Sequence, residues 1–225
     1  MVKIKQFLKK FSVNVIASLD VDPQKGFTFL CPKELPVLGG DEIARELNAN
    51  HRLSSVHAFS KDAHPKNAKW RATKQNPQGT LIHKEANLDQ RWNMHCAVGT
   101  KGFELIPGLP PETYYDFWVY KGVERDMHPY GACYHDLAKK KSTGLIEFLK
   151  SRKIKVVIVG GLATDYCVFE TVMELVAAGF TVILNLASCR GIAVETTMSA
   201  LGKMRAAGVI IARNAREIKK KFVLS

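Results

Sequence analysis

Six short segments of the chain are rich in β-branched and other apolar residues, with little alternation between polar and apolar positions. This pattern is typical of strands that are covered on both faces, as they are in a parallel sheet. The predicted strands are residues 13–22, 53–60, 115–122, 155–161, 181–187 and 209–214.

Segments with the helical spacing of apolar residues lie between these strands. Residues 164–179 place apolar side chains on one stripe and end on Gly179, a natural helix stop. Further helices are predicted over residues 39–50, 143–152 and 194–208, with Asp41 as the cap of the first. Strands that alternate with helices predict right-handed βαβ crossovers. We therefore expect one α/β domain over residues 1–225, with helices on both faces of a parallel sheet.

The formal net charge of +12 raises the question of nucleic-acid binding. Runs of three lysines occur at 139–141 and 219–221, but they lack interleaved aromatic residues for base stacking. The sequence also matches no signature of a nucleic-acid-binding fold. We interpret the charge as a solvated lysine surface and expect no nucleic-acid partner. A basic module that binds RNA or anions is the alternative from a different class.

The sequence also bears on location. No apolar stretch is long enough to cross a bilayer, so we expect no membrane association. The lysine-rich residues 1–22 are interpreted as a lead-in to the first strand rather than a signal peptide, and a transit-like role stays open because residues 1–19 contain no acid. The five cysteines are widely spaced and form no CxxC pair, which is typical of a reducing compartment. We therefore expect a cytoplasmic protein.

Polar residues at the carboxyl ends of the predicted strands are candidates for chemistry, because open parallel sheets bind ligands there. Asp20 and Asp22 end the first strand and point to the same side as long as the chain stays extended. Lys121 follows the apolar run of the third strand. Each also has an ordinary explanation, namely a turn-forming Asp-Pro pair and a surface lysine.

The fourth predicted strand ends in an unusual turn. Gly160 and Gly161 would let the backbone approach a ligand, and Thr164 or Asp165 can cap the next helix, which puts Cys167 in its first turn. Unpaired backbone N–H groups and the helix dipole favour a thiolate there, and the same N–H groups can hold an oxyanion. The alternative is a small cysteine of the core.

A second group of candidates lies in residues 61–112, which hold most of the prolines and several histidines. Asp62 and His64 form an Asp-x-His pair that presents both side chains to one side of an extended chain, and His95 follows later. A carboxylate and two imidazoles make a three-ligand metal site with open positions. Solvated loop histidines are the alternative.

Taken in order, six segments resemble the motifs of the nicotinamidase/pyrazinamidase branch of the isochorismatase-like cysteine hydrolases. They are DPQKGF, LPVLGGDEIARELN, KDAHP, RWNMHCAVGTKGFEL, YKG and GLATDYCV. The resemblance covers most of the chain and implies a single-domain, three-layer α/β/α fold with a six-stranded, mostly parallel, Rossmann-like sheet. It implies hydrolysis of nicotinamide or pyrazinamide in NAD salvage, in a family that often forms homo-oligomers.

The resemblance also implies catalytic roles. Cys167 would be the nucleophile, Asp22 rather than Asp20 the acid–base carboxylate, and Lys121 their charged partner. The backbone N–H groups of Ala163 and Cys167 would form the oxyanion hole. The peptide bond before that alanine is typically cis in the family.

The metal site and the substrate pocket follow from the same resemblance. Asp62, His64 and His95 would bind Zn²⁺, with Fe²⁺ and Mn²⁺ as alternatives, and the metal would bind the pyridine nitrogen of the substrate. Phe27 and Trp92 are the candidates for packing on the pyridine ring.

Three segments depart from the family pattern and concern the substrate pocket. Gly26 stands where an acidic residue often precedes Phe27, NAKWRAT (67–73) replaces a His-Ile-Ser-Phe-like segment, and YGACYH (130–135) replaces a Tyr-Ser-x-Phe-like one. Another hydrolase of the superfamily, acting on isochorismate or an N-carbamoyl compound, is therefore the nearest alternative function.

Overall fold

A six-stranded, entirely parallel sheet forms the centre of the computed structural model, which describes residues 10–224. The strands are β1 (Ile16–Val21), β2 (Val56–Asp62), β3 (Phe117–Lys121), β4 (Val156–Leu162), β5 (Thr181–Arg190) and β6 (Ile210–Ala212). Their order across the sheet is β3-β2-β1-β4-β5-β6. Each predicted strand is present, and the predicted α/β class is confirmed. The lysine-rich residues 1–9 lie outside the described part of the chain.

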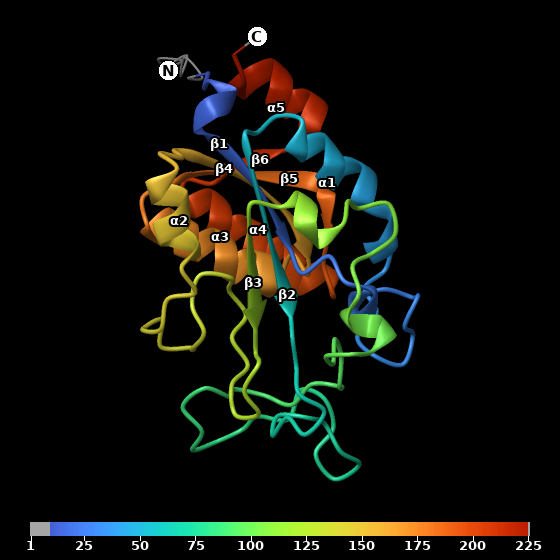
Figure 1. Cartoon of the computed structure of the whole chain (residues 1–225). Helices are drawn as coiled ribbons and strands as arrows, with labels where there is room; N and C mark the ends of the chain where they lie inside the picture. The colour runs from blue at the N-terminus through green and yellow to red at the C-terminus, as the bar shows by residue number, and fades with distance from the viewer. Residues whose placement is uncertain (1–9, 225) are drawn as a thin grey trace.

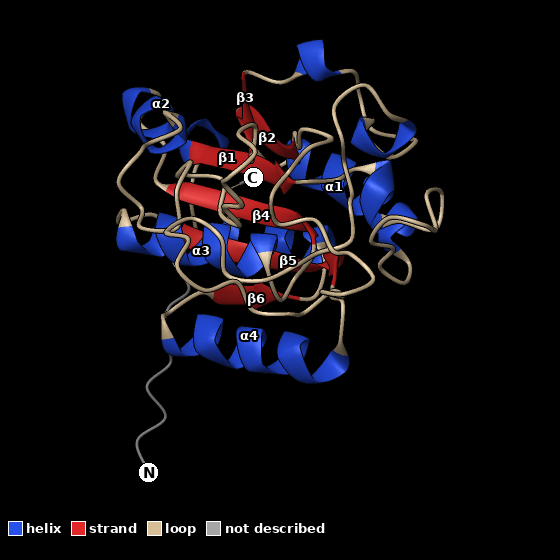
Figure 2. Cartoon of the chain, turned by 90° about the horizontal axis from the view of Figure 1, so that it is seen from below, coloured by secondary structure: helices blue, strands red, loops and turns tan. Residues whose placement is uncertain are grey.

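Helices cover both faces of the sheet (Figures 1 and 2). They are α1 (Ala44–His51), α2 (Leu145–Ser151), α3 (Cys167–Ala177), α4 (Val194–Ala206) and α5 (Ala215–Phe222). The first and the last, α1 and α5, contact one face, whereas α2 and α3 contact the other and α4 packs beside α3. The apolar pattern predicted the first four helices but missed α5.

The middle of the sheet is apolar because it lies between these helix layers. Every residue of β1 and β4 is buried, which explains why both strands are mostly apolar and show no alternation of polar and apolar positions in the sequence. Several element boundaries differ from the predicted ones. Residues Val13–Val15 form a 3-10 turn that Ser12 caps, so β1 starts later. Asp41 lies in the 3-10 turn Gly40–Glu42 and caps no helix, so its predicted role is wrong.

The carboxyl ends of β1 to β4 meet at one edge of the sheet, and long connections cross that edge. The segment between β2 and β3 runs beyond the strand ends in Figure 1. It contributes Trp70, Leu88 and Trp92 to a second apolar cluster, together with residues from other loops and α1. These connections therefore cover the edge of the sheet to which the candidate residues were assigned.

Two predictions about the whole chain can be compared with the structure. No helix within residues 10–224 is long and apolar enough to cross a membrane. All five cysteines are free thiols, as their spacing predicted.

Candidate active site

An acid, an amine and a thiol from three strands lie together at the carboxyl edge of the sheet. Asp22 follows β1, Lys121 ends β3, and Cys167 opens α3 just after β4. Lys121 Nζ lies 2.9 Å from Asp22 Oδ2 and 3.5 Å from Cys167 Sγ. All three are buried, so the predicted convergence of these groups is present.

The two aspartates at the end of β1 do not share this site. Asp20 is fully buried within the strand, where Oδ2 lies 2.8 Å from His51 Nε2 and accepts a hydrogen bond from Tyr115 at 2.9 Å. Asp22 has a φ of 46°, so the extended conformation has ended there. The expectation that both carboxylates point the same way therefore fails at the residue that reaches Lys121.

Two polar residues that the sequence analysis missed hold Asp22 and Asp62 in place. The Ser60 hydroxyl donates to Asp22 Oδ1 at 2.6 Å. The Gln24 side chain bonds both backbone groups of Asp62: its Nε2 donates to the carbonyl and its Oε1 accepts from the amide, each at 2.8 Å. Gln24 belongs to the quoted DPQKGF segment, which was the available signal, whereas a serine within a strand gives none.

Burial sets the resting protonation of the acid and the thiol. Desolvation raises the pKa of Asp22 to about 6, although Lys121 opposes this rise. Desolvation also raises the pKa of the Cys167 thiol well above its ordinary value, against the charge of Lys121. The expected lowering of this pKa by the helix start is thus outweighed by burial. At neutral pH the site holds a thiol, a carboxylate that can accept its proton, and an ammonium group.

A second carboxylate completes the charge balance. Burial alone would lower the pKa of Lys121, but Asp22 and Asp62 outweigh it and hold this pKa well above its ordinary value. Burial alone would raise the pKa of Asp62, but Lys121 and His64 outweigh it and hold this pKa well below its ordinary value. Lys121 also donates a hydrogen bond to Asp62 Oδ1. One buried cation therefore lies between two buried carboxylates.

The turn that carries Cys167 differs in detail from the prediction. The Leu162–Ala163 peptide bond is cis, as expected, and the Ala163 carbonyl accepts from the amides of Tyr166 and Val168. Tyr166 occupies the N-cap position of α3 without a side-chain cap, so the prediction of Thr164 or Asp165 as its cap is wrong.

Asp165 instead serves the start of α4. Its carboxylate accepts hydrogen bonds from the amides of Ile192 and Ala193 and from the Thr196 hydroxyl. The turn after β4 is thereby tied to the neighbouring helix, which fixes the position of the cysteine from outside the reacting groups.

The paired glycines also have a different role. A Cβ at Gly160 would meet the Ser188 hydroxyl and Leu47, and a Cβ at Gly161 would overlap the backbone of Val21. Both glycines therefore allow close packing inside the sheet and against its helices. The expectation that they open the backbone to a ligand is not borne out.

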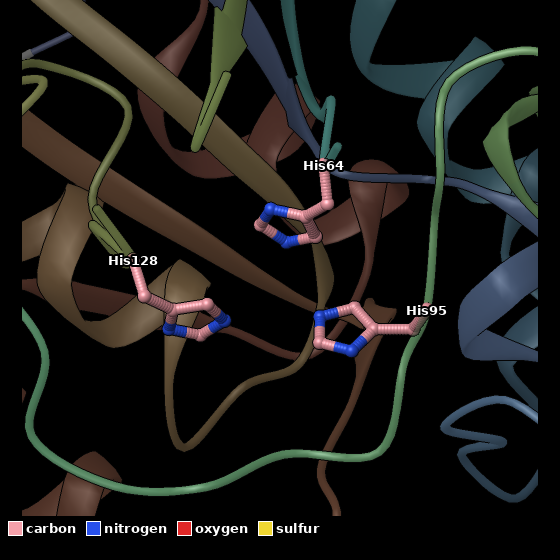
Figure 3. A group of neighbouring side chains, drawn as sticks. All are labelled: His64, His95 and His128. Carbon is pink, nitrogen blue, oxygen red and sulfur yellow. The ribbon is translucent and has the colours of Figure 1, made fainter. Parts of the chain in front are cut away.

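Three histidine rings from separate segments turn toward one another beside this site (Figure 3). His64 follows β2, and His95 and His128 come from the long connections, with ligand atoms within 4.8 Å of one another. The Nε2 atoms of His64 and His95 lie 3.3 and 3.5 Å from Asp62 Oδ2. The structure therefore brings the three predicted residues together and adds His128, which no sequence motif indicated.

These side chains fit a divalent metal ion. His64 Nε2 and both ring nitrogens of His128 are buried and have no hydrogen-bond partner among residues 10–224. Burial lowers the pKa of His64 and holds the pKa of His128 well below its ordinary value, so both rings are neutral. Neutral imidazoles beside an ionised carboxylate form a donor set that suits Zn²⁺ and similar ions.

A small pocket opens beside the cysteine. Its lining residues are Phe27, Leu35, Asp62, Trp92, His95, His128, Tyr130, Ala163, Tyr166, Cys167 and Ile192. The two candidate aromatic residues are thus placed at the pocket, and Trp92 Nε1 donates to the Tyr130 hydroxyl at 3.0 Å. The pocket offers aromatic walls, a thiol and imidazoles to one small ligand.

The departing segments contribute to these walls. Trp70, from NAKWRAT, is fully buried and meets His64 and His128 edge to face, with ring centroids 4.6 Å apart in each case. Tyr130, from YGACYH, lines the pocket. The sequence could flag these segments as different but could not place their side chains.

The sequence of the chain is similar to those of known proteins. The chain matches the model of the isochorismatase domain over residues 17–216. It is 31% identical over 206 residues to a nicotinamidase of Acinetobacter baylyi, an alignment that covers 90% of this chain and 94% of that protein. It is also 31% identical over 120 residues to a nicotinamidase/pyrazinamidase of Mycobacterium tuberculosis, which covers 52% of this chain and 61% of that protein.

The fold is also similar to those of solved structures. A nicotinamidase/pyrazinamidase of Acinetobacter baumanii superposes with a TM-score of 0.81 at 28% identity, covering 91% of this chain and 98% of that one. A nicotinate complex from L. infantum gives 0.76 at 25% identity, with coverage of 90% and 94%. A zinc complex of a pyrazinamidase from Pyrococcus horikoshii gives 0.67 at 25% identity, with coverage of 88% and 98%.

The fold and the site together define an α/β protein with a cysteine-centred site at the carboxyl edge of a parallel sheet. The chain belongs to the isochorismatase family. The resemblance stated from the sequence is thereby confirmed.

Proposed function

We propose that the chain is a nicotinamidase, which hydrolyses nicotinamide to nicotinate and ammonia in NAD salvage. One observation carries the proposal. Asp22, Lys121 and Cys167 meet within ion-pair and hydrogen-bond reach, beside a cluster of histidines and an aromatic pocket. The relatives described as nicotinamidases support this choice of substrate.

In the first step Cys167 Sγ attacks the carboxamide carbon, and the thiol proton passes to Asp22. General acid–base transfer of this kind contributes roughly 10²–10⁴-fold to rate. The ammonium group of Lys121, 3.5 Å from the sulfur, stabilises the thiolate as it forms. The C–N bond then breaks, Asp22 returns the proton to the leaving nitrogen, and ammonia departs.

The remaining thioester is hydrolysed in the second step. Asp22, ionised again, takes a proton from water, whose oxygen attacks the acyl carbon. The C–S bond breaks, the proton returns to the sulfur, and nicotinate leaves. Each step alternates Asp22 between its two protonation states, which suits a carboxyl group whose pKa burial raises to about 6.

Binding groups around the reacting atoms complete the proposal. The backbone N–H groups of Ala163 and Cys167 stabilise the oxyanion, and a donor of this kind is worth on the order of 10²-fold or more. Phe27 and Trp92, which line the pocket, pack on the pyridine ring.

We propose Zn²⁺ as the cofactor, with Fe²⁺ and Mn²⁺ as alternatives. Asp62, His64 and His95 would hold the ion, and His128 joins them because its ring nitrogens find no hydrogen-bond partner in the described part of the chain. When bound, the ion supplies a Lewis acid for the pyridine nitrogen and so anchors the ring. The protein is further proposed to be cytoplasmic and to form a homo-oligomer, as the family often does.

The test is ammonia release from nicotinamide by the purified protein loaded with Zn²⁺. We expect turnover of nicotinamide and pyrazinamide, with nicotinate formed in equal amount to ammonia in the first case. Isochorismate and an N-carbamoyl amine serve as comparison substrates in the same assay. Turnover of either comparison substrate with none of nicotinamide would overturn the proposal in favour of another hydrolase of the family. Salt-dependent RNA binding without any hydrolysis would favour the basic binding module.

A further inference from the structure

A carboxylate outside the reacting groups reaches the backbone beside one of the clustered histidines. Glu34 lies in the loop before α1, and its Oε2 accepts a hydrogen bond from the Cys96 amide at 2.8 Å. That amide belongs to the peptide bond that joins His95 to Cys96. Glu34 therefore contacts the chain directly after a candidate metal ligand without touching the ligand's ring.

Two glycines leave the space that this carboxylate occupies. A Cβ at Gly26 would lie 2.5 Å from Glu34 Oε2, and a Cβ at Gly102 would overlap both carboxylate oxygens. Both glycines have ordinary negative φ angles, so the backbone itself does not require glycine there. The close approach of Glu34 does require it, because any side chain would displace the carboxylate.

The peptide that Glu34 holds connects two of the histidines. Cys96 adopts a left-handed conformation with φ of 49°, which an L-residue seldom adopts without support. Its carbonyl accepts from the His64 amide at 3.3 Å, while its own amide donates to Glu34. The segment of His95 is thereby aligned with the segment of His64 at Cys96, next to a second backbone hydrogen bond from the Val98 amide to the His64 carbonyl at 3.0 Å.

The ring of His95 has a separate local contact. Its Nδ1 lies 2.7 Å from the Asn93 carbonyl oxygen, which orients the ring relative to its own segment. This contact does not act on the Cys96 peptide itself. Glu34 holds that peptide in addition to the backbone hydrogen bonds to His64, and outer contacts of this kind tune metal sites strongly.

We propose that Glu34 is a positioning residue of the metal site, which sets the spacing of His95 and His64 by holding the Cys96 amide. The proposal rests on the metal role given to these histidines under the proposed function. It concerns affinity for the ion, because Glu34 contacts neither the substrate pocket nor the reacting groups.

The test measures the dissociation constant of Zn²⁺ for the metal-free protein by competition with a chromophoric chelator. Glu34→Ala should raise this constant by roughly 10–100-fold. Glu34→Gln keeps an acceptor oxygen and should recover most of the affinity, which a general loss of stability would not predict. Glu104→Ala is the matched control, because Glu104 is an exposed carboxylate that pairs with Lys25 at 2.5 Å, and this variant should bind Zn²⁺ like wild type.

A second variant covers the case in which Glu34→Ala does not fold. Gly102→Ala keeps Glu34 but displaces its carboxylate, so it should weaken Zn²⁺ binding to a similar extent. His95→Ala distinguishes a failure of the proposed Glu34 role from a failure of the proposed metal site. If His95→Ala weakens Zn²⁺ binding while the Glu34 and Gly102 variants match wild type, the role of Glu34 is refuted alone. If His95→Ala also binds like wild type, the proposed metal site fails and the role of Glu34 fails with it.

Discussion

Single residues at the end of β1 show how the backbone selects one carboxylate for chemistry. Asp20 and Asp22 differ by only two positions, yet Asp20 pairs with His51 and Tyr115 inside the fold. Asp22 adopts a φ of 46° and turns toward Lys121, where Ser60 fixes its other oxygen. Asp22 is therefore buried, held by a hydrogen bond and paired with one cation. Such an environment shifts the pKa of an acid–base group.

The raised pKa of Asp22 predicts a pH dependence of turnover. The carboxyl group must be ionised to take the thiol proton, and burial raises its pKa from 3.8 to about 6. Activity should therefore be high above this value and fall as the pH drops through about 6. The measurement is kcat/KM for nicotinamide against pH, which reports groups of the free enzyme. An acid limb centred near 4 instead would contradict the proposed environment of Asp22.

At the scale of residues, the sequence predicted the reactive groups better than the residues that surround and position them. Asp22, Lys121 and Cys167 stand in motifs with fixed spacing, so their convergence could be predicted. Ser60 and His128 could not, because their roles depend on which side chains the folded chain places opposite them. Asp165 has the right chemistry for a helix cap, but its carboxylate serves the neighbouring helix rather than its own.

At the scale of elements, the apolar pattern was informative where burial is complete. β1 and β4 are buried along their whole length, and both were predicted from mostly apolar segments without alternation. The last helix, α5, was missed although its buried residues Ala215, Ile218 and Phe222 recur at helical spacing. Asn214 also caps it by accepting a hydrogen bond from the Glu217 amide, so the local signal for this short helix was present in the sequence.

Two glycines in different elements should respond in opposite ways to the same substitution. Gly161→Ala would place a Cβ against the Val21 backbone in the middle of the sheet, so it should destabilise the fold by at least about 2–3 kcal/mol. Gly202 lies within α4 with open space around it, and Gly202→Ala should stabilise by about 0.5–1 kcal/mol. Urea unfolding of both variants and wild type gives the comparison. A Gly161→Ala protein as stable as wild type would refute the packing role assigned to that glycine.

At the scale of the whole molecule, a regular scaffold carries an irregular cover. The order of strands brings four carboxyl ends to one edge, and the connections between β2 and α2 supply His95, His128 and Trp92 over that edge. The scaffold could be predicted because alternating strands and helices leave few topologies. The connections over the edge could not be predicted, because their residues follow no regular period. They pack through contacts between aromatic and histidine rings. For the same reason, the reacting groups at the strand ends could be predicted from the sequence, whereas most residues that line the pocket could not.

The most direct measurement of the central claim compares ammonia release from nicotinamide by wild type, Cys167→Ala and Cys133→Ala. Cys133 is the matched control, because it is also a buried free cysteine but lies away from the pocket lining. We expect Cys167→Ala to fold and to lose at least about a thousandfold in kcat, whereas Cys133→Ala keeps turnover near that of wild type. Folded Cys167→Ala protein that releases ammonia at the wild-type rate would contradict the account.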